Sequence, residues 1–338
     1  IERLNLIGCT MQVVILAGGI GSRLSPWTKS IPKPLLPMLD RTLLEQVIYS
    51  IPPNIVDEVI VAGGYKVDMI KSYFDSIDCD FEISIVNETE PLGTGGALGN
   101  CRDAVSGTFA CFNGDIISSL DVNDLLSLHK SNGGIGTLGL WEVDDPTRFG
   151  IVGIDENNKV TKFMEKPTED QVFSNLINAG SYIFEDDIFD YMPHGRHSLE
   201  RDVFPNLAEP KLLNGMPFDG YFIDAGTRDS WCEAVAKCVQ QNRFNRGNLQ
   251  TNSWFAESII NSDSVKITES MIEQKVKLGS STICSSTILR GSIISDDCII
   301  DNCMIGKECV IGKNSKLSNL IVGHNSVIPD GTIASNGI

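Results

Sequence analysis

Two kinds of segment alternate over roughly the first 230 residues. Short runs rich in β-branched residues, such as 11–17 and 58–62, have the composition of strands, whereas 67–74 and 120–129 carry apolar residues at helical spacing. Expected strands cover 11–17, 58–62, 82–86, 109–112, 159–164 and 181–184, and expected helices cover 67–74, 97–104, 120–129 and 228–244. This alternation predicts an α/β fold with a mostly parallel sheet and helices on both of its faces.

The pattern changes beyond about residue 258. Aliphatic residues then recur every five or six positions, from Leu278 to Ile328, and small residues such as Cys298 and Cys309 follow some of them by four positions. Short periods of this kind indicate a parallel β-helix, in which these two cysteines would face inward. The predicted organisation is an N-terminal extension (1–10), an α/β domain (11–227), a linker helix and connection (228–257) and a β-helix (258–338).

Charge and cysteine content narrow the range of partners. The 27 basic and 44 acidic residues give a net charge of −17, which disfavours binding to nucleic acid or to an anionic membrane. No apolar run reaches the length of a membrane span, and no signal peptide precedes Met11, so a cytoplasmic location is expected. Ten cysteines without a CxxC pair favour free thiols over disulfides or a zinc site.

The segment 16–35, LAGGIGSRLSPWTKSIPKPL, follows the first expected strand. Its glycines can bring backbone N–H groups close to an anion, and Arg23 adds a forked cationic donor suited to phosphate. Prolines restrict the backbone around Lys33, so that side chain loses less freedom on meeting a phosphate. The segment matches neither a P-loop nor a dinucleotide-binding turn, and it predicts a cradle for a triphosphate. A glycine-rich surface turn is the alternative.

Further candidate binding residues follow other expected strands. The segment 88–98, ETEPLGTGGAL, could approach a flat nucleobase with its backbone, although an ordinary strand-to-helix turn would look similar. Asp115 and Asp224 each come at the end of a strand, where a carboxylate can bind Mg²⁺. Glu165 and Lys166 lie side by side in the chain, and could serve a polyol and an anion or form a surface ion pair.

These segments together resemble the signature of the sugar-nucleotide pyrophosphorylases, nucleotidyltransferases that join a sugar 1-phosphate to a nucleoside triphosphate. The pattern LAGGxGxRLxPxTxxxPKPLxP is matched through Pro37, with Ser22 where threonine is commoner. The resemblance spans about residues 11–335. It implies a Rossmann-like nucleotidyltransferase sheet followed by a left-handed hexapeptide-repeat β-helix, and it gives the segment 198–205 a structural part only.

The resemblance also implies roles for individual residues. Arg23, Lys33 and Lys166 are the expected catalytic cations, and Asp115 and Asp224 the expected ligands of Mg²⁺. The expected nucleotide-binding residues are Leu16, Gly18, Gly19, Gly21, Ser22, Glu88, Gly93, Thr94 and Gly95. The expected sugar-phosphate site consists of Gly150, Glu165, Lys166, Asn178 and Gly180.

The LGTGG form of the second glycine segment is more typical of the guanylyltransferase branch of this family. The resemblance therefore implies GTP and mannose 1-phosphate as the substrates and GDP-mannose as the product. Glucose 1-phosphate with UTP or dTTP is the alternative, and a heptose 1-phosphate is also open. A regulatory subunit that binds a nucleotide sugar without catalysis would have the same fold. A second, acyltransferase activity is a further alternative, but His324 is the only histidine in the β-helix that could serve it. Self-association through the β-helix into a homo-oligomer is expected.

Overall fold

The computed structural model describes residues 10–256 and 264–335. Its contacts divide the chain into two compact units. The first unit contains the chain up to Gly19 and Val47–Phe222, and the second contains Ile20–Gln46 and the chain from Ile223 onward. The predicted domain boundaries stay a prediction, but this division cuts the first glycine-rich segment between Gly19 and Ile20.

The first unit is built on one mixed sheet, in which seven strands run in the order β10-β9-β11-β6-β1-β4-β5 and β8 joins β11 to β12. The strands are β1 (Met11–Leu16), β4 (Val56–Gly63), β5 (Ile83–Asn87), β6 (Phe109–Asn113), β8 (Gly136–Glu142), β9 (Gly150–Ile154), β10 (Val160–Glu165), β11 (Leu176–Phe184) and β12 (Leu213–Pro217). Strand β1 pairs in parallel with β4 and β6, which places its end at the centre of the parallel half. The predicted fold class is confirmed, and antiparallel pairs of β11 with β6 and β8 extend the sheet.

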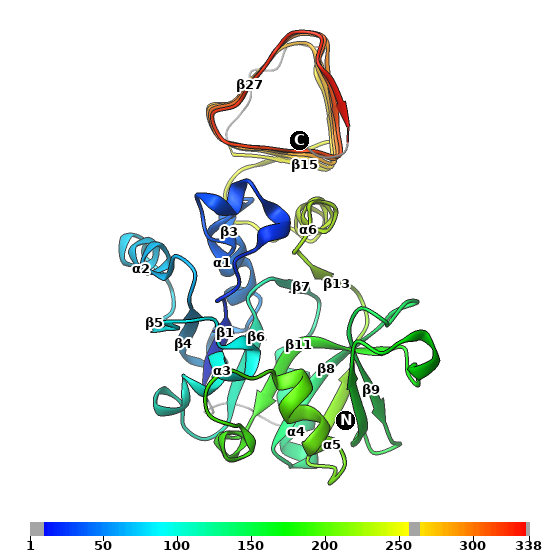
Figure 1. Cartoon of the computed structure of the whole chain (residues 1–338). Coiled ribbons are helices and arrows are strands. Elements are labelled where there is room, and N and C mark those ends of the chain that lie inside the picture. The colour runs from blue at the N-terminus through cyan, green and yellow to red at the C-terminus, as the bar shows by residue number, and fades with distance from the viewer. Residues whose placement is uncertain (1–9, 257–263, 336–338) are drawn as a thin grey trace. The chain divides into compact units, whose positions relative to one another are not determined.

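Helices and short turns cover this sheet (Figure 1). The helices of the first unit are α2 (Val67–Ser76), α3 (Gly93–Gly99), α4 (Val122–Asn132) and α5 (Phe204–Ala208), with the π-helical turn η8 (Leu199–Val203) and the 3₁₀ turns η4 (Pro53–Ile55), η5 (Arg102–Ala104), η6 (Glu169–Gln171) and η7 (Asp186–Tyr191). Helix α1 (Leu43–Ile48) spans the boundary of the units, and β7 (Ile116–Ser118) and β13 (Phe222–Asp224) are short strands. Aromatic rings fill the core under β11, where Tyr182 stacks on Phe184 at 5.1 Å between centroids and Phe204 packs on Tyr182 at 5.4 Å.

Helix α3 differs from the prediction, which placed a glycine loop before a helix over 97–104. The observed helix begins at Gly93 inside the glycine segment, and residues 102–104 form the separate turn η5. The backbone of His197 lies directly on this helix, because Gly95 N and Gly96 N donate to its carbonyl at 3.1 and 3.2 Å. A Cβ at Gly93 would lie 2.5 Å from that oxygen. The glycines therefore permit a close approach of two backbones rather than a loop.

The second unit contains helix α6 (Arg228–Gln240) and a parallel β-helix of three sheets, whose stacked coils form a triangular section in Figure 1. The first sheet consists of β14 (Asn248–Gln250), β15 (Ser253–Phe255), β17 (Met271–Ile272), β20 (Thr287–Ile288), β23 (Met304–Ile305) and β26 (Ile321–Val322). The second consists of β16 (Lys266–Thr268), β19 (Ser281–Cys284), β22 (Cys298–Asp301), β25 (Lys316–Ser318) and β28 (Ile333–Ser335), and the third of β18 (Lys277–Leu278), β21 (Ile293–Ile294), β24 (Val310–Ile311) and β27 (Val327–Ile328).

Aliphatic side chains stack inside these coils, as the sequence period predicts. Ile283, Ile300 and Leu317 are paired in register in successive coils and are buried. Cys298 and Cys309 are also buried in this core, and the nine cysteines of the described part of the chain are free thiols. The predicted inward-facing position of both cysteines is confirmed. Cys9 lies outside the described residues.

The segment 20–46 belongs to the second unit and packs on the β-helix. It contains η1 (Ser22–Leu24), η2 (Trp27–Lys29), η3 (Lys33–Leu35), β2 (Pro37–Met38) and β3 (Arg41–Thr42). The buried indole of Trp27 donates to the carbonyl oxygen of Val322 at 2.9 Å and stacks on the His324 ring at 5.8 Å between centroids. The later part of the first glycine-rich segment is thus anchored to the coils of the β-helix.

We expect two substitutions within α3 to have opposite effects on stability. A Cβ at Gly95 would lie 2.5 Å from Nε2 of His197, whereas a Cβ at Gly99 would meet only ordinary contacts at 3.7 and 3.8 Å. Gly95→Ala should lower the free energy of unfolding by about 2 kcal/mol through overpacking. Gly99→Ala should raise it by about 0.5 kcal/mol through helix propensity and reduced chain entropy. Denaturant titration measures both, and equal effects would contradict the packing described for α3.

Candidate functional site

The predicted site residues are distributed over both units. In the second unit, Gly21 directly precedes the turn η1 and adopts a left-handed backbone with φ of 68°. A Cβ at Gly21 would lie 2.9 Å from Cβ of Lys33, and the Thr28 hydroxyl donates to the Gly21 carbonyl at 3.0 Å. Only 7% of Lys33 is exposed. Its aliphatic stem therefore packs closely against the backbone at Gly21.

Arg23 and Asp224 also lie together in the second unit. Nη2 of Arg23 is 3.8 Å from Oδ2 of Asp224, and 57% of the arginine side chain is exposed. A Cβ at Gly226 would lie 2.5 Å from the same guanidinium nitrogen. The absence of a side chain at Gly226 therefore lets the guanidinium lie close to the strand end while it stays open to solvent. A planar cation in this setting suits phosphate oxygens. Ser22 belongs to the same short turn as Arg23.

In the first unit, Gly18 and Glu88 meet at the carboxyl ends of β1 and β5. Leu16 ends β1, Glu88 follows β5 directly, and a Cβ on Gly18 would overlap the Glu88 carboxylate. Nothing lies within 4 Å of where a Cβ on Gly19 would be, so the backbone there is accessible. Burial raises the pKa of the Glu88 carboxyl, while the Leu92 N–H, which donates to Oε2 at 3.3 Å, opposes the change. Glu88 therefore lies under the start of the glycine-rich segment.

Thr94 connects the second glycine segment to the turn η8. Its hydroxyl donates to Oε2 of Glu200 at 2.6 Å and accepts from Leu199 N at 3.0 Å. The segment 198–205 was expected to have a structural part only, and sequence reasoning missed Glu200 as a neighbour of the site. The LERDV string offers charged residues, but only the fold brings one of them to Thr94.

The predicted sugar-phosphate residues come together where β9 and β10 pair. Glu165 lies opposite Gly150 in register, and a Cβ at Gly150 would lie 2.9 Å from Oε2 of Glu165. Nζ of Lys166 is 3.6 Å from Oε1 of Glu165, with 57% of the lysine and 15% of the glutamate side chain exposed. Burial and the nearby charge of Glu200 raise the pKa of the Glu165 carboxyl, and Lys166 opposes the change. The pair thus presents a solvent-facing cation beside a partly buried carboxyl.

Asn178 and Gly180 lie within β11, at an irregularity in its pairing with β8. Nδ2 of Asn178 donates to the Tyr182 hydroxyl at 2.8 Å, and its Oδ1 accepts from Gly180 N at 3.2 Å. Gly180 has a φ of 62°, and a Cβ there would overlap the amide of Asn113 at the end of β6. The bulge therefore requires glycine and turns the backbone of β11 toward the end of β6.

A family model described as nucleotidyl transferase matches residues 12–241, about two thirds of the chain. The chain belongs to the nucleotidyl transferase family. A second model, described as GlmU-like C-terminal hexapeptide, matches residues 260–335 and covers most of the β-helix. The family resemblance drawn from the signature is thus confirmed.

Two similar proteins are named as mannose-1-phosphate guanylyltransferases. The chain is 37% identical over 235 residues to a mannose-1-phosphate guanylyltransferase of Mycobacterium tuberculosis, an alignment that covers 68% of this chain and 65% of that protein. It is 36% identical over 222 residues to the mannose-1-phosphate guanylyltransferase catalytic subunit beta of Dictyostelium discoideum, covering 64% of this chain and 61% of that protein. The chain therefore spans somewhat less than two thirds of the length of these relatives.

A solved structure of HddC from Yersinia pseudotuberculosis is also similar, with a TM-score of 0.56 and 30% identity over 68% of this chain and 99% of HddC. A second structure of HddC, in complex with GMP-PN, matches equally well. This likeness supports a nucleotidyl transferase fold over about two thirds of the chain.

Nucleotidyltransferases of this kind generally use a divalent metal. Asp115, just after β6, and Asp224, at the end of β13, offer hard carboxylate oxygens and are only partly buried. Magnesium needs one or two protein carboxylates when water and phosphate supply its other ligands, so the chemistry of these donors fits. Residues 10–256 and 264–335 hold no cluster of three or more His, Cys, Asp or Glu side chains that could bind a metal by itself.

No helix in these ranges is long and apolar enough to cross a membrane.

The raised pKa of Glu165 predicts a pH-dependent effect of Glu165→Gln. A carboxyl whose pKa is higher in the folded state stabilises the fold below its unfolded pKa of about 4.3, and this contribution is lost as pH rises through the folded pKa. The variant should therefore gain stability relative to the parent as pH rises from 4 to 7, because the neutral amide does not carry the cost of a buried carboxylate. Urea titrations across this range measure the difference, and Glu156→Gln, in an exposed turn, controls for net charge. A pH-independent difference would contradict the described environment of Glu165.

Proposed function

We propose that this chain catalyses nucleotidyl transfer from GTP to mannose 1-phosphate, producing GDP-mannose and pyrophosphate. The observation that carries the proposal is that Arg23, Lys33, Asp115, Lys166 and Asp224 all occur within the nucleotidyl transferase match. A regulatory subunit without activity would be free to lose several of them. The names of the curated relatives support the choice of mannose 1-phosphate and of a guanine nucleotide.

Recognition of the base is proposed to use the residues from Glu88 to Thr94. The amides of Gly95 and Gly96 already donate to the carbonyl of His197, so they are not available to a nucleobase. The proposed donors and acceptors for guanine therefore lie before Gly95, and Gly95 contributes close packing of α3. That HddC, a similar protein, was crystallised with GMP-PN supports a guanine nucleotide.

The proposed reaction is an in-line attack by a phosphate oxygen of the sugar 1-phosphate on the α-phosphorus of GTP. The oxygen–phosphorus bond to the β-phosphate breaks, and pyrophosphate leaves with its electron pair. A phosphate monoester is anionic near neutral pH, so no general base is required. Positioning and neutralisation of charge then account for catalysis.

Each cation has a proposed part in this step. The exposed ammonium of Lys166 holds the attacking phosphate, while Glu165, Gly150, Asn178 and Gly180 line the sugar side. Arg23 binds the departing pyrophosphate, since its guanidinium is exposed and suited to two oxygens. The backbone of Gly18, Gly19 and Gly21 faces the triphosphate, together with Ser22, and Lys33 contributes charge there. Mg²⁺ held by Asp115 and Asp224 would add neutralisation of phosphate charge.

The proposal is tested by measuring pyrophosphate release with Mg²⁺, with four nucleoside triphosphates crossed against the 1-phosphates of mannose, glucose and N-acetylglucosamine. Release with GTP and mannose 1-phosphate supports both substrates. A preference for UTP or dTTP with glucose 1-phosphate would keep the reaction and overturn the specificity. If no pair reacts, a heptose 1-phosphate with GTP is the next test, and its failure would favour the regulatory-subunit alternative.

Loss of a proposed catalytic cation should lower kcat/KM strongly. We expect Arg23→Ala and Lys166→Ala to cost about 2.7–4 kcal/mol of transition-state stabilisation, by analogy with loss of one oxyanion donor, which is about 100-fold or more. Lys162→Ala is the matched control, because Lys162 is also an exposed lysine of β10. Steady-state kinetics with saturating Mg²⁺ measures the effect. A loss within about tenfold for either variant would contradict its proposed part.

Self-association through the β-helix is also proposed. Ile293, Val310 and Val327 are paired in register in successive coils of the third sheet, yet each is exposed. A ladder of exposed aliphatic side chains is a surface that a second copy could cover. Light scattering on the purified chain gives the number of copies, and Val310→Lys should reduce it. A monomer at all concentrations would overturn the proposal.

A further inference from the structure

One short stretch of the β-helix, residues 319–324, contacts two segments that carry proposed catalytic groups. The stretch runs from the corner after β25 through β26 to the next corner. It contacts Trp27, in the segment that carries Arg23. It also contacts Arg228, which follows Asp224 by four positions. All of these residues belong to the second unit. The nucleotidyl transferase match ends at residue 241, so it assigns no part to this stretch.

The first contact is made by Trp27, which lies between the proposed cations Arg23 and Lys33 in the chain. Its indole is fully buried, stacks on the His324 ring with 26° between the planes and donates to the Val322 carbonyl oxygen at 2.9 Å. A large buried ring whose one polar atom is paired makes a strong anchor. The coil therefore sets the position of this part of the segment.

Hydrogen bonds connect Trp27 to the turn that carries Arg23. The hydroxyl of Thr28, the next residue, donates to the Gly21 carbonyl oxygen at 3.0 Å, and a Cβ at Gly21 would lie 3.1 Å from the Thr28 methyl carbon. Leu24 N donates to the same carbonyl oxygen at 3.0 Å and closes the turn η1. A shift of Trp27 against the coil would therefore displace Arg23.

The His324 ring is itself fixed by the preceding coil. Its Nδ1 accepts from Lys307 N at 2.9 Å, so the neutral ring carries its proton on Nε2. A Cβ at Gly306 would lie 2.7 Å from Nδ1, so glycine at that position permits the contact. Burial, and then the charge of Lys307, lower the pKa of the imidazole, which favours the neutral form. The ring therefore presents a fixed, uncharged face to Trp27.

The second contact fixes the start of α6, behind Asp224. Nη1 of Arg228 donates to the carbonyl oxygen of Asn319. Nδ2 of Asn302, one coil earlier, donates to Oδ1 of Asp229 at 2.7 Å and to Oδ1 of Asn319 at 2.8 Å. The segment that carries Asp224 is thus attached to the same coil as the first contact.

The two contacts account for the closeness of Arg23 and Asp224. Their nearest charged atoms are 3.8 Å apart, with 57% of the arginine and 36% of the aspartate side chain exposed. An exposed ion pair of this kind contributes little to holding its partners together. The backbones of the two segments must therefore set the distance, and both segments are attached to the stretch 319–324.

We propose that the stretch 319–324 of the β-helix, and His324 in particular, positions Arg23 and Asp224 for nucleotidyl transfer. The β-helix then serves the reaction within a single chain, whether or not the chain self-associates. His324 touches no substrate and acts through Trp27, as a positioning residue. The effect on catalysis rests on the proposed function, whereas the attachment of the segment does not.

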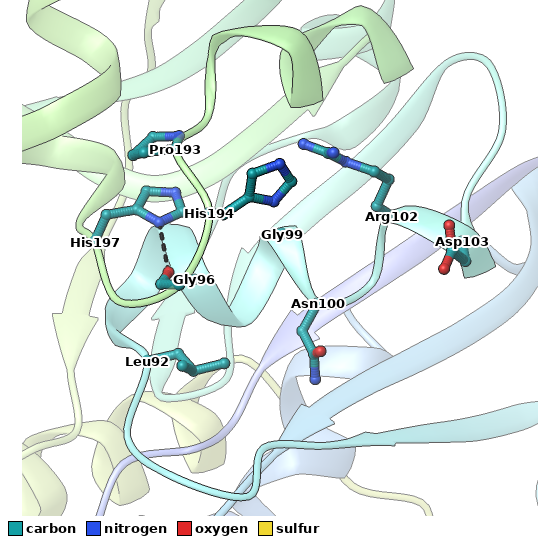
Figure 2. A pocket seen from close by; sticks show the side chains of 10 residues that line it. Leu92, Gly96, Gly99, Asn100, Arg102, Asp103, Pro193, His194 and His197 are labelled. Carbon is teal, nitrogen blue, oxygen red and sulfur yellow. Dashed lines mark hydrogen bonds between the residues drawn. The ribbon is translucent and has the colours of Figure 1, made fainter.

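Hydrogen exchange of the whole chain, measured by mass spectrometry, tests the attachment. His324→Ala removes the ring, and we expect the amides of 21–31 to exchange at least about tenfold faster because local opening becomes easier. His324→Phe keeps a ring over Trp27 and should restore most of the protection. His194→Ala is the matched control, because it removes an exposed imidazole from the wall of a pocket in the first unit (Figure 2) and should leave these amides unchanged.

Trp27→Phe tests the same contact from the other side, in case His324→Ala unfolds the last coils. It keeps a buried ring but loses the hydrogen bond to Val322, so 21–31 should again exchange faster. Peptides from β22 to β24 report whether the coils remain folded. Unchanged exchange of 21–31 in these variants, with the coils intact, would show that the stretch does not hold the segment and would overturn the proposal.

Steady-state kinetics tests the positioning. His324→Ala should raise the KM for GTP and lower kcat/KM at least about tenfold, because a displacement of about 1 Å can cost about 100-fold. It should leave the KM for mannose 1-phosphate within about twofold, because Glu165 and Lys166 lie in the first unit. A merely structural effect would reduce the amount of folded enzyme, and hence kcat, without changing either KM. Arg290→Gln, at the same corner two coils earlier and exposed, should change both KM values less than about twofold.

The outcomes separate this proposal from the proposed function. Faster exchange with unchanged kinetics would confirm the attachment and overturn the positioning. If the parent chain turns over no substrate pair, calorimetric titration with GTP and Mg²⁺ replaces the kinetics, and His324→Ala should weaken GTP binding about tenfold. Equal GTP affinity of parent and variant would overturn the positioning. A parent chain that neither binds nor turns over GTP would overturn the proposed function and the positioning with it, while hydrogen exchange would still decide the attachment.

Discussion

The contact between the backbone of His197 and helix α3 is the constraint on which the position of the second glycine segment, the proposed base-binding segment, depends. The His197 carbonyl accepts from two glycine amides of α3, and its N–H donates to Leu92. Side chains on Gly93 or Gly95 would prevent this approach. Because the same stretch leads into η8, the contact also brings Glu200 to Thr94. One close approach of two backbones thus positions both the glycine segment and the carboxylate that supports it.

A second constraint acts on the cations of the glycine-rich signature. Gly18 lies over Glu88 in the first unit. In the second unit, Trp27 donates a hydrogen bond to Val322 and stacks on His324 of the β-helix. The coils of the β-helix therefore hold the segment that carries Arg23. An aromatic anchor of this kind combines a large buried area with one hydrogen bond.

Charge is arranged locally in a protein that is acidic as a whole. Arg23 lies near Asp224 and Lys166 near Glu165, and both cations keep more than half of their side chains exposed. Such loose pairs contribute little to stability, and both cations stay open to solvent. Burial, together with the nearby charge of Glu200, raises the pKa of the Glu165 carboxyl beside Lys166.

The sequence by itself determined the strand and helix alternation, the β-helix period and the family, because each of these depends on local spacing and on a long, specific string of residues. It could not place the start of α3 or the neighbours of Thr94, since glycine has no side-chain preference that reveals what packs against it. His197 and Glu200 reach the glycine segment from about a hundred residues away in the chain. Only the tertiary structure decided these contacts, because close packing of distant backbones leaves no periodic trace in the sequence.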